Sequence, residues 1–563
     1  MAANNSSARG KHTWLKWTGM ILLVVFIVLG VAIGISVRRA EPMLRAVIVE
    51  KLSDHFHARV ELDQFHISVA NGLWAEGKGL RIWPPVGIVK DGSIPGPTAS
   101  IPPLIQLNEF RFHAPLEYKP NKPIHIALLE MKGLTIDVPP KSQTAKPPTN
   151  GEIQQSAAAK PLGPKLVNFE IESIQCTGAH LTLGTSKPGK LPLEFAIAHV
   201  TLSHFSPNNP MDFNAQLTNP KPAGTIETSG TIGPWMVEDP GETPLAGDYR
   251  FEHADLGVFK GIAGILESMG KFDGSLRDMA VEGETTTPNF QLTQFGTAVQ
   301  LRTHFQAMVD GTNGDTHLKQ VSAMLGQSRF LVSGEIIRQQ AETMRNGRER
   351  PGGREIALKV NMDRARIEDF LRLTSKSGTP LLTGYVTCGS TVEIPPGTDS
   401  VLKRLKLNGR FELDDAQFTS EKIQNDVRQL SLRGQGDTKG AKNGGDENVR
   451  SAMQSDFTLM DSTITLPNLE YTVLGAEIDV KGKYGIDGGT LDFVGTARTQ
   501  ATVSQMVGGW KGMLLRPADR FFKKNGSGTE VPIHINGTRE DPKFGVDFNR
   551  MKHTSPATPG AQP

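Results

Sequence analysis

Apolar and polar residues alternate along most of the chain beyond residue 58, and this alternation predicts β-strands. It is clearest in FRFHAPLEY, IHIALLEMKGLTIDV, VNFEIESI, AHLTLGT, AIAHVTLSHF and MDFNAQLT. Because successive side chains of a strand point to opposite faces, each segment would have one apolar and one polar face. Antiparallel strands with one solvated face are the simplest arrangement that fits this pattern.

A short phrase recurs within the strand-like segments: two apolar residues at alternate positions, followed by glycine on the same face. Glycine inside a strand marks a bulge, a bend or a close approach of two backbones. The phrase therefore predicts a sheet that curves in one direction many times, although chance recurrence in a glycine-rich chain is the alternative. It occurs at Met279, Val281 and Gly283; Phe330, Val332 and Gly334; Leu405, Leu407 and Gly409; Ile478, Val480 and Gly482; Leu491, Phe493 and Gly495; and Ile533, Ile535 and Gly537.

Apolar residues at three- and four-residue steps predict a few short helices. One begins at Glu41 and carries Leu44, Val47, Ile48, Leu52 and Phe56 on one side. Residues 254–270 and residues 363–378 show the same spacing, the second with Asp363 as a possible cap. Residues 504–524 are a further candidate, for a packed capping helix or an interfacial element, although a proline divides them.

Residues 18–37 form an uncharged apolar run, which at about 1.5 Å per helical residue spans roughly the 30 Å of a bilayer core. Trp14 and Trp17 precede it and Arg38 and Arg39 follow it, as at the ends of a membrane anchor. A cleaved signal peptide is the alternative, but its apolar core is normally shorter. The flanking charges favour a cytoplasmic C-terminal side only weakly, because long domains translocate largely regardless of charge.

The overall charge gives no reason to expect a nucleic-acid partner, because 61 basic and 59 acidic residues leave a net charge of only +2. Cysteine usage excludes a disulfide scaffold and a cysteine-rich metal site, since Cys176 and Cys388 are the only two. They could form one disulfide in an oxidising compartment, but two buried thiols are the favoured interpretation.

Catalytic and cofactor motifs are absent from the sequence. It contains no H-E-x-x-H, no G-x-S-x-G, no G-x-x-x-x-G-K-[ST] and no G-x-G-x-x-G after a strand. The 14 histidines are scattered, and His199 and His204 do not have the spacing of a zinc pair. We therefore predict a protein that is not an enzyme, with no catalytic residue, no metal and no cofactor.

Three polar segments divide the β-rich part of the chain. Residues 139–165, 338–354 and 433–450 are rich in glycine, proline or charge and are expected to be loops or linkers. The middle one is basic and could contact phosphate headgroups, but it has no aromatic residues and no second basic cluster, so a solvated loop is the favoured interpretation. The predicted organisation is a tail at 1–17, an anchor at 18–37, an N-terminal region with a helix and strands at 40–138, a linker at 139–165, a middle β region at 166–337, a linker at 338–354, a C-terminal β region at 355–550 and a disordered tail at 551–563.

Both ends of the chain resemble the AsmA family of bacterial envelope proteins. The N-terminal likeness lies in the anchor followed by PMLRAVIVEKLSDHFHARVELDQFHISVANGLWAEGKGLRI. The C-terminal likeness lies in ARIEDFLRLTSKSGTPLLTGYV, RLKLNGRFELDDAQFT, LEYTVLGAEIDVKGKYGIDGGTLDFVGTA and VPIHINGTREDPKFGVDF. The middle of the chain is similar only in its general sequence pattern, and the family has no invariant catalytic signature.

The resemblance implies a single-pass protein of the bacterial inner membrane, with a cytoplasmic tail and a large periplasmic body. That body would be an elongated, curved antiparallel β-groove, similar to bridge-like proteins that conduct lipids. The implied partners are phospholipid or another lipid, the inner membrane and envelope or outer-membrane proteins. Lipid transport to the outer membrane, or its homeostasis, is the expected role.

The expected lipid-facing positions are apolar residues of the recurring phrase. They are Phe330, Val332, Leu405, Leu407, Ile478, Val480, Leu491, Phe493, Ile533 and Ile535. The alternative is a membrane-tethered scaffold with filled β-sandwich cores, which assists outer-membrane protein assembly through surface loops. Strand alternation is the same in both cases, so the sequence leaves both open. A hydrolase with an unrecognised site is a third, weaker hypothesis.

Overall fold

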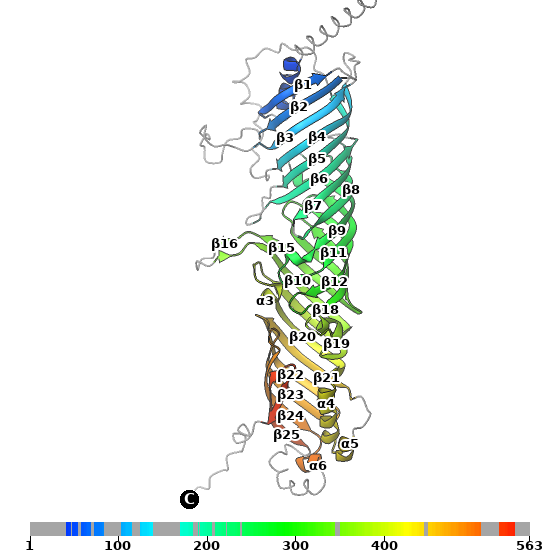
Figure 1. Cartoon of the computed structure of the whole chain (residues 1–563), viewed down its shortest axis with the longest axis vertical. Coiled ribbons are helices and arrows are strands. Elements are labelled where there is room, and N and C mark those ends of the chain that lie inside the picture. Colours follow the sequence, from blue (N-terminus) through cyan, green and yellow to red (C-terminus); the bar gives the residue numbers. More distant parts are fainter. Residues whose placement is uncertain are drawn as a thin grey trace, which may run out of the picture. The chain divides into compact units, whose positions relative to one another are not determined.

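The computed structural model is mainly β, with a few short helices, which confirms the predicted fold class at that level (Figure 1). The structure describes residues 41–46, 48–54, 58–68, 73–83, 103–114, 124–138, 169–183, 190, 192–204, 209–220, 222–236, 239–343, 349–375, 377–443, 449–507 and 528–546. The tails at 1–17 and 551–563, the predicted anchor at 18–37 and the linker at 139–165 lie outside these residues.

The chain divides into two compact units. Unit 1 comprises Met1–Ser186, Glu194–Leu217 and Ser229–Pro240, and unit 2 comprises Lys187–Leu193, Thr218–Thr228 and Gly241–Pro563. The strands β6 (Leu193–Ser203), β7 (Met211–Pro220) and β8 (Ala223–Ile232) contribute residues to both units. Each unit is described by itself below.

Unit 1 contains a five-stranded ladder with a helix on its apolar face. The strands are β1 (Val60–Ser68), β2 (Leu73–Ile82), β3 (Ile105–Ala114), β4 (Ile124–Val138) and β5 (Phe169–Leu183). The helix predicted to begin at Glu41 is present at 41–46 and 48–54. Its Ile48 packs against the buried cluster that includes Leu62 and Phe110, and the Nε of Arg45 donates to the Leu62 carbonyl oxygen at 2.8 Å.

One strand pairing in unit 1 differs from the all-antiparallel prediction. Strands β1 to β4 pair antiparallel in chain order, but β4 and β5 are parallel. A parallel pair needs a connection of a dozen residues or more, whereas an antiparallel pair needs only a short turn. Residues 139–168, between the two strands, are long enough to provide it.

Unit 2 contains one long series of antiparallel neighbours. The strands are β9 (Pro244–Asp255), β11 (Ile265–Ser275), β12 (Met279–Leu292), β13 (Ala298–Val309), β14 (Thr316–Leu325), β15 (Ser328–Gln339), β18 (Gly353–Arg366), β19 (Leu382–Ile394), β20 (Lys406–Phe418), β21 (Ser451–Met460), β22 (Thr463–Val473), β23 (Ala476–Gly485), β24 (Thr490–Thr499), β25 (Thr529–Thr538) and β26 (Pro542–Val546). Each pairs with the next along this series. The sheet is curved (Figure 1).

Smaller elements complete unit 2. Strand β10 (Ile262–Ala263) pairs with β12, and β16 (Glu342–Thr343) and β17 (Glu349–Arg350) form a hairpin between β15 and β18. The helices are η2 (Pro240–Glu242), η3 (Leu256–Val258), α2 (Ile367–Arg372), α3 (Val401–Arg404), α4 (Glu421–Gly434), α5 (Thr438–Asn443) and α6 (Val503–Val507). The predicted loops at 338–354 and 433–450 thus contain β16, β17, the end of α4, and α5.

The helix predicted at 254–270 is wrong. These residues form η3, β10 and the start of β11 instead. Gly261 and Gly264 adopt φ values of 105° and 139°, which are incompatible with an α-helix. Pairing of β11 with both β9 and β12 satisfies the backbone instead, so tertiary context overrides the local helical spacing.

The other predicted helices are present in shortened form. In residues 363–378, α2 begins after Arg366 rather than after Asp363, because Asp363 still belongs to β18. Of the candidate at 504–524, the structure describes only residues 504–507, which belong to α6 (Val503–Val507). Within the described ranges, no helix is both long and apolar enough to cross a membrane.

The six recurring glycines lie where neighbouring backbones come too close for a side chain. A Cβ added at Gly495 would lie 1.9 Å from the Asp479 carbonyl oxygen, and one at Gly334 would lie 2.2 Å from that of Ala357. Atoms crowd on the concave side of a bent sheet, so the phrase marks that side. A Cβ added at each of the other four glycines would also lie too close to a backbone oxygen, at 2.7 Å (Gly283), 2.4 Å (Gly409), 2.1 Å (Gly482) and 2.6 Å (Gly537).

We expect Gly495→Ala to lower the free energy of unfolding by about 1–3 kcal/mol, because the methyl group overpacks the contact with β23. Gly389→Ala is the matched control, since only the Asn361 side chain lies near its added Cβ, at 3.6 Å. It should change stability by less than about 1 kcal/mol. Urea unfolding of the two variants tests this. Equal effects would mean that the close approach does not constrain residue 495.

Cys176 and Cys388 are free thiols, the first buried and the second half-buried. Burial raises the pKa of both thiols. Because the thiolate is the reactive form, we expect both to react with an alkylating reagent at pH 7.5 at least about tenfold more slowly in the folded protein than in urea. Mass spectrometry of timed samples measures this. Rapid labelling of the folded chain would contradict the burial of Cys176.

Candidate functional site

One face of the sheet in unit 2 is apolar from strand to strand. The register pairs Val332 with Val360, Leu358 with Val392, Val392 with Leu407, and Leu407 with Leu459. Side chains of paired residues lie on the same face of a sheet, so the last three pairs form one row across β18 to β21, and the Val332–Val360 pair lies in the neighbouring row of that face. The row continues through Ile464, Tyr484 and Leu491.

The predicted positions share this face. Phe330 and Val332 lie in β15, Leu407 in β20, Ile478 and Val480 in β23, Leu491 and Phe493 in β24, and Ile533 and Ile535 in β25. The register joins Phe493 to Ile535, and the face that carries these residues also carries the recurring glycines. Leu405 is the exception, since it ends α3 just before β20 begins.

Helices cover one margin of the apolar face. Phe370 of α2 meets Phe330 in a T-shaped contact with ring centroids 5.7 Å apart, and Phe370 also packs against the buried cluster that contains Val386 and Leu413. Val427 of α4 packs beside Tyr471, and Ile478 lies against the same cluster. Two predicted positions therefore lie beneath helices, since Phe330 contacts Phe370 of α2 and Ile478 packs against the cluster that contains Val427 of α4.

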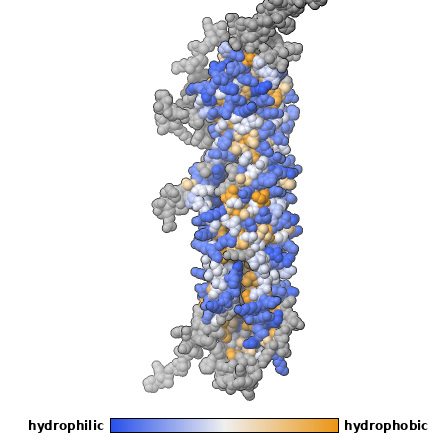
Figure 2. All heavy atoms as spheres, viewed as in Figure 1, coloured by the Kyte–Doolittle hydropathy of each residue, from blue (hydrophilic) through white to orange (hydrophobic). Residues whose placement is uncertain are grey.

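Away from those helices, many large apolar side chains of this face are only half-buried. Val332, Leu358, Leu407, Leu491 and Ile535 all belong to this class. A sealed core would bury such residues almost completely, as it does Val480 and Phe493, which are 6% and 7% exposed. Figure 2 shows apolar atoms between polar ones on the visible face of unit 2.

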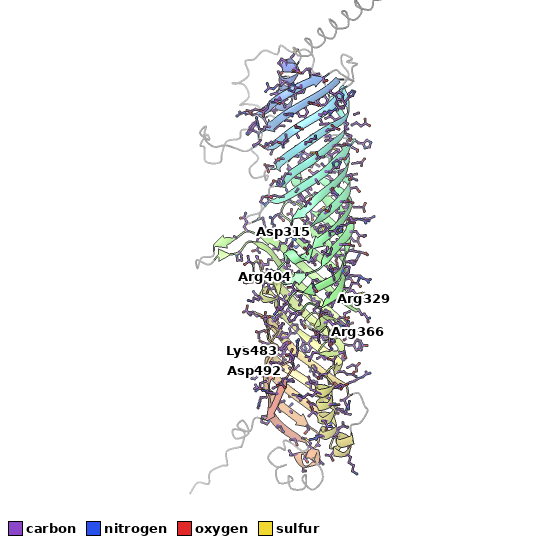
Figure 3. All side chains as sticks on the ribbon, viewed as in Figure 1. Asp315, Arg329, Arg366, Arg404, Lys483 and Asp492 are labelled. Carbon is purple, nitrogen blue, oxygen red and sulfur yellow. The ribbon has the colours of Figure 1, made fainter. Side chains whose placement is uncertain are left out.

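The opposite face of the same strands is charged and solvated. His304 lies between Glu282 and Glu284, and Arg498 forms ion pairs with Glu477 and Asp479. Lys483 and Asp492 are register partners on β23 and β24 (Figure 3). The sheet thus separates an apolar face from a charged one along its series of strands.

Polar contacts join opposite ends of strands that are far apart in sequence. The Gln294 Nε2, after β12, donates to the Asp487 Oδ1, after β23, at 3.0 Å. The Val401 N–H donates to the Lys260 carbonyl at 2.8 Å, and the Arg539 Nη1 donates to the Thr374 carbonyl at 3.3 Å. We call this set of contacts the seam. The seam shows that the two rims of the curved sheet, which are formed by the opposite ends of its strands, meet each other. The apolar face lies between these rims.

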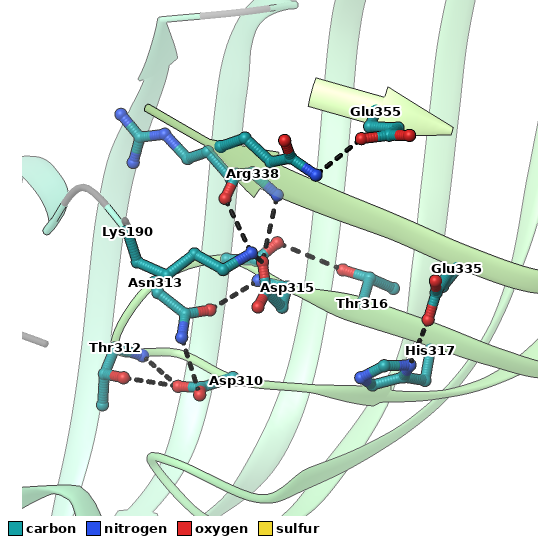
Figure 4. A network of polar contacts seen from close by, with 12 residues as sticks. Lys190, Asp310, Thr312, Asn313, Asp315, Thr316, His317, Glu335, Arg338 and Glu355 are labelled. Carbon is teal, nitrogen blue, oxygen red and sulfur yellow. Dashed lines mark hydrogen bonds and ion pairs between the residues drawn. The ribbon is translucent and has the colours of Figure 1, made fainter. Parts of the chain in front are cut away.

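A further rim contact centres on Lys190, just before β6 and within unit 2 (Figure 4). The Lys190 ammonium lies 3.1 Å from the Asp315 Oδ1 and 2.8 Å from the Arg338 carbonyl oxygen. Both charged side chains are largely buried, and the Arg338 backbone N–H also donates to Asp315 at 3.0 Å. This ion pair joins the segment before β6 to the ends of β14 and β15.

The turn beside Asp315 satisfies its own polar groups. The Asp310 carboxylate accepts hydrogen bonds from the Thr312 backbone and hydroxyl and from the Asn313 amide, at 2.5–2.9 Å. The Asn313 side-chain oxygen accepts one from the Asp315 N–H at 2.8 Å. In the portion of the chain that the structure describes, no group of three or more His, Cys, Asp or Glu residues could hold a metal ion.

Sequence reasoning did not single out Lys190 or Asp315, and it included Arg338 and Arg354 only as the bounds of a basic segment that was interpreted as a solvated loop. A signal for the two arginines was present, since each stands two residues from an isoleucine that lies on the apolar face. Arg338 follows Ile336 in β15, and Arg354 precedes Ile356 in β18. No pattern indicated Lys190, because its partners are 125 and 148 residues away.

The fold of unit 2 and its apolar face define a structural class of protein. It has a curved antiparallel sheet with one apolar concave face and one charged convex face. Comparison with known proteins adds no relative to this description. No family model, no curated protein and no solved structure matches the chain.

The Lys190–Asp315 pair allows a test of the rim contact. We expect Asp315→Ala to lower the free energy of unfolding by about 3–5 kcal/mol, because it leaves a largely buried ammonium without its carboxylate. Adding Lys190→Ala should recover part of this loss, with a coupling energy of about 1–3 kcal/mol. A double-mutant cycle by urea unfolding measures it, and additive effects would rule out the pairing.

Proposed function

We propose that the chain binds the acyl chains of phospholipid along the apolar face of unit 2 and supports lipid transport between membranes. The observation that carries the proposal is the continuous apolar face with half-buried side chains, behind a charged outer face. Acyl chains would lie on the apolar face while the convex face stays in water. This task needs no catalytic residue.

The length of the strand series suits a conduit more than a single pocket. Neighbouring strands lie about 4.8 Å apart, so the series from β9 to β26 spans roughly 65 Å along the stack. The hydrocarbon core of a bilayer is about 30 Å thick, so one lipid acyl layer needs only about 15 Å. The face therefore has room for several lipids in succession.

The resemblance of both chain ends to the AsmA family supports a place in the bacterial envelope. In this proposal residues 18–37 anchor the chain in the inner membrane and the β-rich part lies in the periplasm. The recurring glycines add support, because they mark a concave apolar face, as a lipid groove requires.

A scaffold that assists outer-membrane protein assembly is the second candidate. It is favoured by the helices α2 and α4, which cover one margin of the apolar face, and by the seam, as in a filled core. The two candidates differ in whether the remaining half-buried side chains contact lipid.

Lipid extraction followed by mass spectrometry of the purified full chain tests the proposal. We expect several phospholipids per wild-type chain and a reduction of at least about fivefold in Val332→Asp, because a carboxylate on the apolar face opposes acyl-chain binding. Ser333→Asp is the control. It introduces the same carboxylate one residue away, on the convex face opposite Lys359, and should keep the wild-type lipid load.

Val332→Phe separates loss of binding from loss of folding. It is apolar and reduces the free volume above the face without introducing a charge, so it should lower the lipid load while circular dichroism stays unchanged. A folded wild-type chain without lipid would contradict the proposal and favour the scaffold.

A further inference from the structure

Two arginines occupy one end of the apolar face, at the rim of β15 and β18. Arg338 and Arg354 are direct register partners, and the next pairs along the same face are Ile336 with Ile356 and Gly334 with Leu358. Two cations thus lie at the end of an apolar strip, at the boundary with the polar rim.

Directly opposed like charges on adjacent strands destabilise a sheet unless a counter-charge lies between them. Among the described residues, no carboxylate forms an ion pair with either guanidinium. The Arg338 Nη1 donates to the Pro192 carbonyl oxygen at 2.9 Å, which leaves other N–H donors of that guanidinium available. The nearby Asp315 is engaged by the Lys190 ammonium and the Arg338 backbone.

The surroundings of Arg354 suit an anion that enters from solvent. Its side chain is exposed, yet the surrounding protein and then the charge of Arg338 lower its pKa. The exposed guanidinium can be reached by an anion from solvent. An arginine remains charged at neutral pH, so the pair presents two cations there.

We propose that Arg338 and Arg354 bind the phosphate of a phospholipid headgroup whose acyl chains lie on the neighbouring apolar strip. Guanidinium groups match phosphate oxygens with parallel N–H donors, and a shared phosphate removes the repulsion between the two cations. From Arg338 to Val332 the strand runs for roughly 20 Å, longer than the ~15 Å of one acyl layer. This inference rests on the proposed lipid-binding function.

The test offers the full chain, in detergent, an equimolar mixture of a phosphodiester phospholipid and a diacylglycerol with identical acyl chains. The ratio of the two bound lipids is measured by mass spectrometry after extraction. Wild-type protein should prefer the phospholipid about tenfold, the scale of one charge-assisted hydrogen bond. Arg354→Gln should bind a similar total amount of lipid and lose most of that preference, whereas Arg354→Lys should retain part of it.

Arg329→Gln is the matched control. Arg329 also lies in β15, is exposed, and stands on the convex face opposite Met324. It removes the same charge from the same strand, so the wild-type preference should persist. Circular dichroism confirms that the variants are folded.

Three results would overturn the assignment, and they differ from one another. An unchanged lipid ratio in Arg354→Gln would remove the headgroup site and leave the lipid-binding function intact. Absence of both lipids from wild-type protein would remove the function and the site together. Displacement of the phospholipid by an equal concentration of inorganic phosphate would assign the arginines to free phosphate instead.

Discussion

Close approach of neighbouring backbones on one face of the sheet is the constraint on which unit 2 depends. At Gly482 and Gly495 an added Cβ would lie 2.1 Å and 1.9 Å from a carbonyl oxygen of the adjacent strand. Only glycine fits such a contact, so the strands bend toward the face that carries it. The same face carries the apolar side chains, and the bend therefore turns them inward.

The other features of unit 2 follow from this bending of the sheet toward its apolar face. The charged side chains are left on the convex face, where Arg498 and its acidic neighbours are solvated. Continued bending brings the two rims together, and contacts such as Gln294 with Asp487 form between strand ends almost 200 residues apart. The interior is bounded by polar contacts at the seam and by α2 and α4 at one margin. Side chains such as Leu407 nevertheless stay half-buried, so packed side chains do not fill the interior completely.

The sequence predicted the parts of this fold that depend on local pattern. Alternation identified the strands, and the glycine phrase identified the concave face, because one residue type fits a contact repeated along the sheet. Prediction failed where pairing partners decide the structure: residues 254–270 have helical spacing but form β10 and β11, and β5 pairs parallel across a long connection. The Lys190–Asp315 pair and the register that places Arg338 opposite Arg354 could not be predicted, because rim contacts and strand register join distant positions.

The central claim is that the apolar face of unit 2 contacts lipid in the cell. A photo-reactive amino acid placed at Leu407, on that face, and separately at Asn408, on the convex face, tests it most directly. After irradiation of living cells, the account predicts phospholipid adducts on the purified chain at position 407 and none at 408. Cross-links from position 407 to neighbouring strands alone, without any lipid adduct, would contradict it.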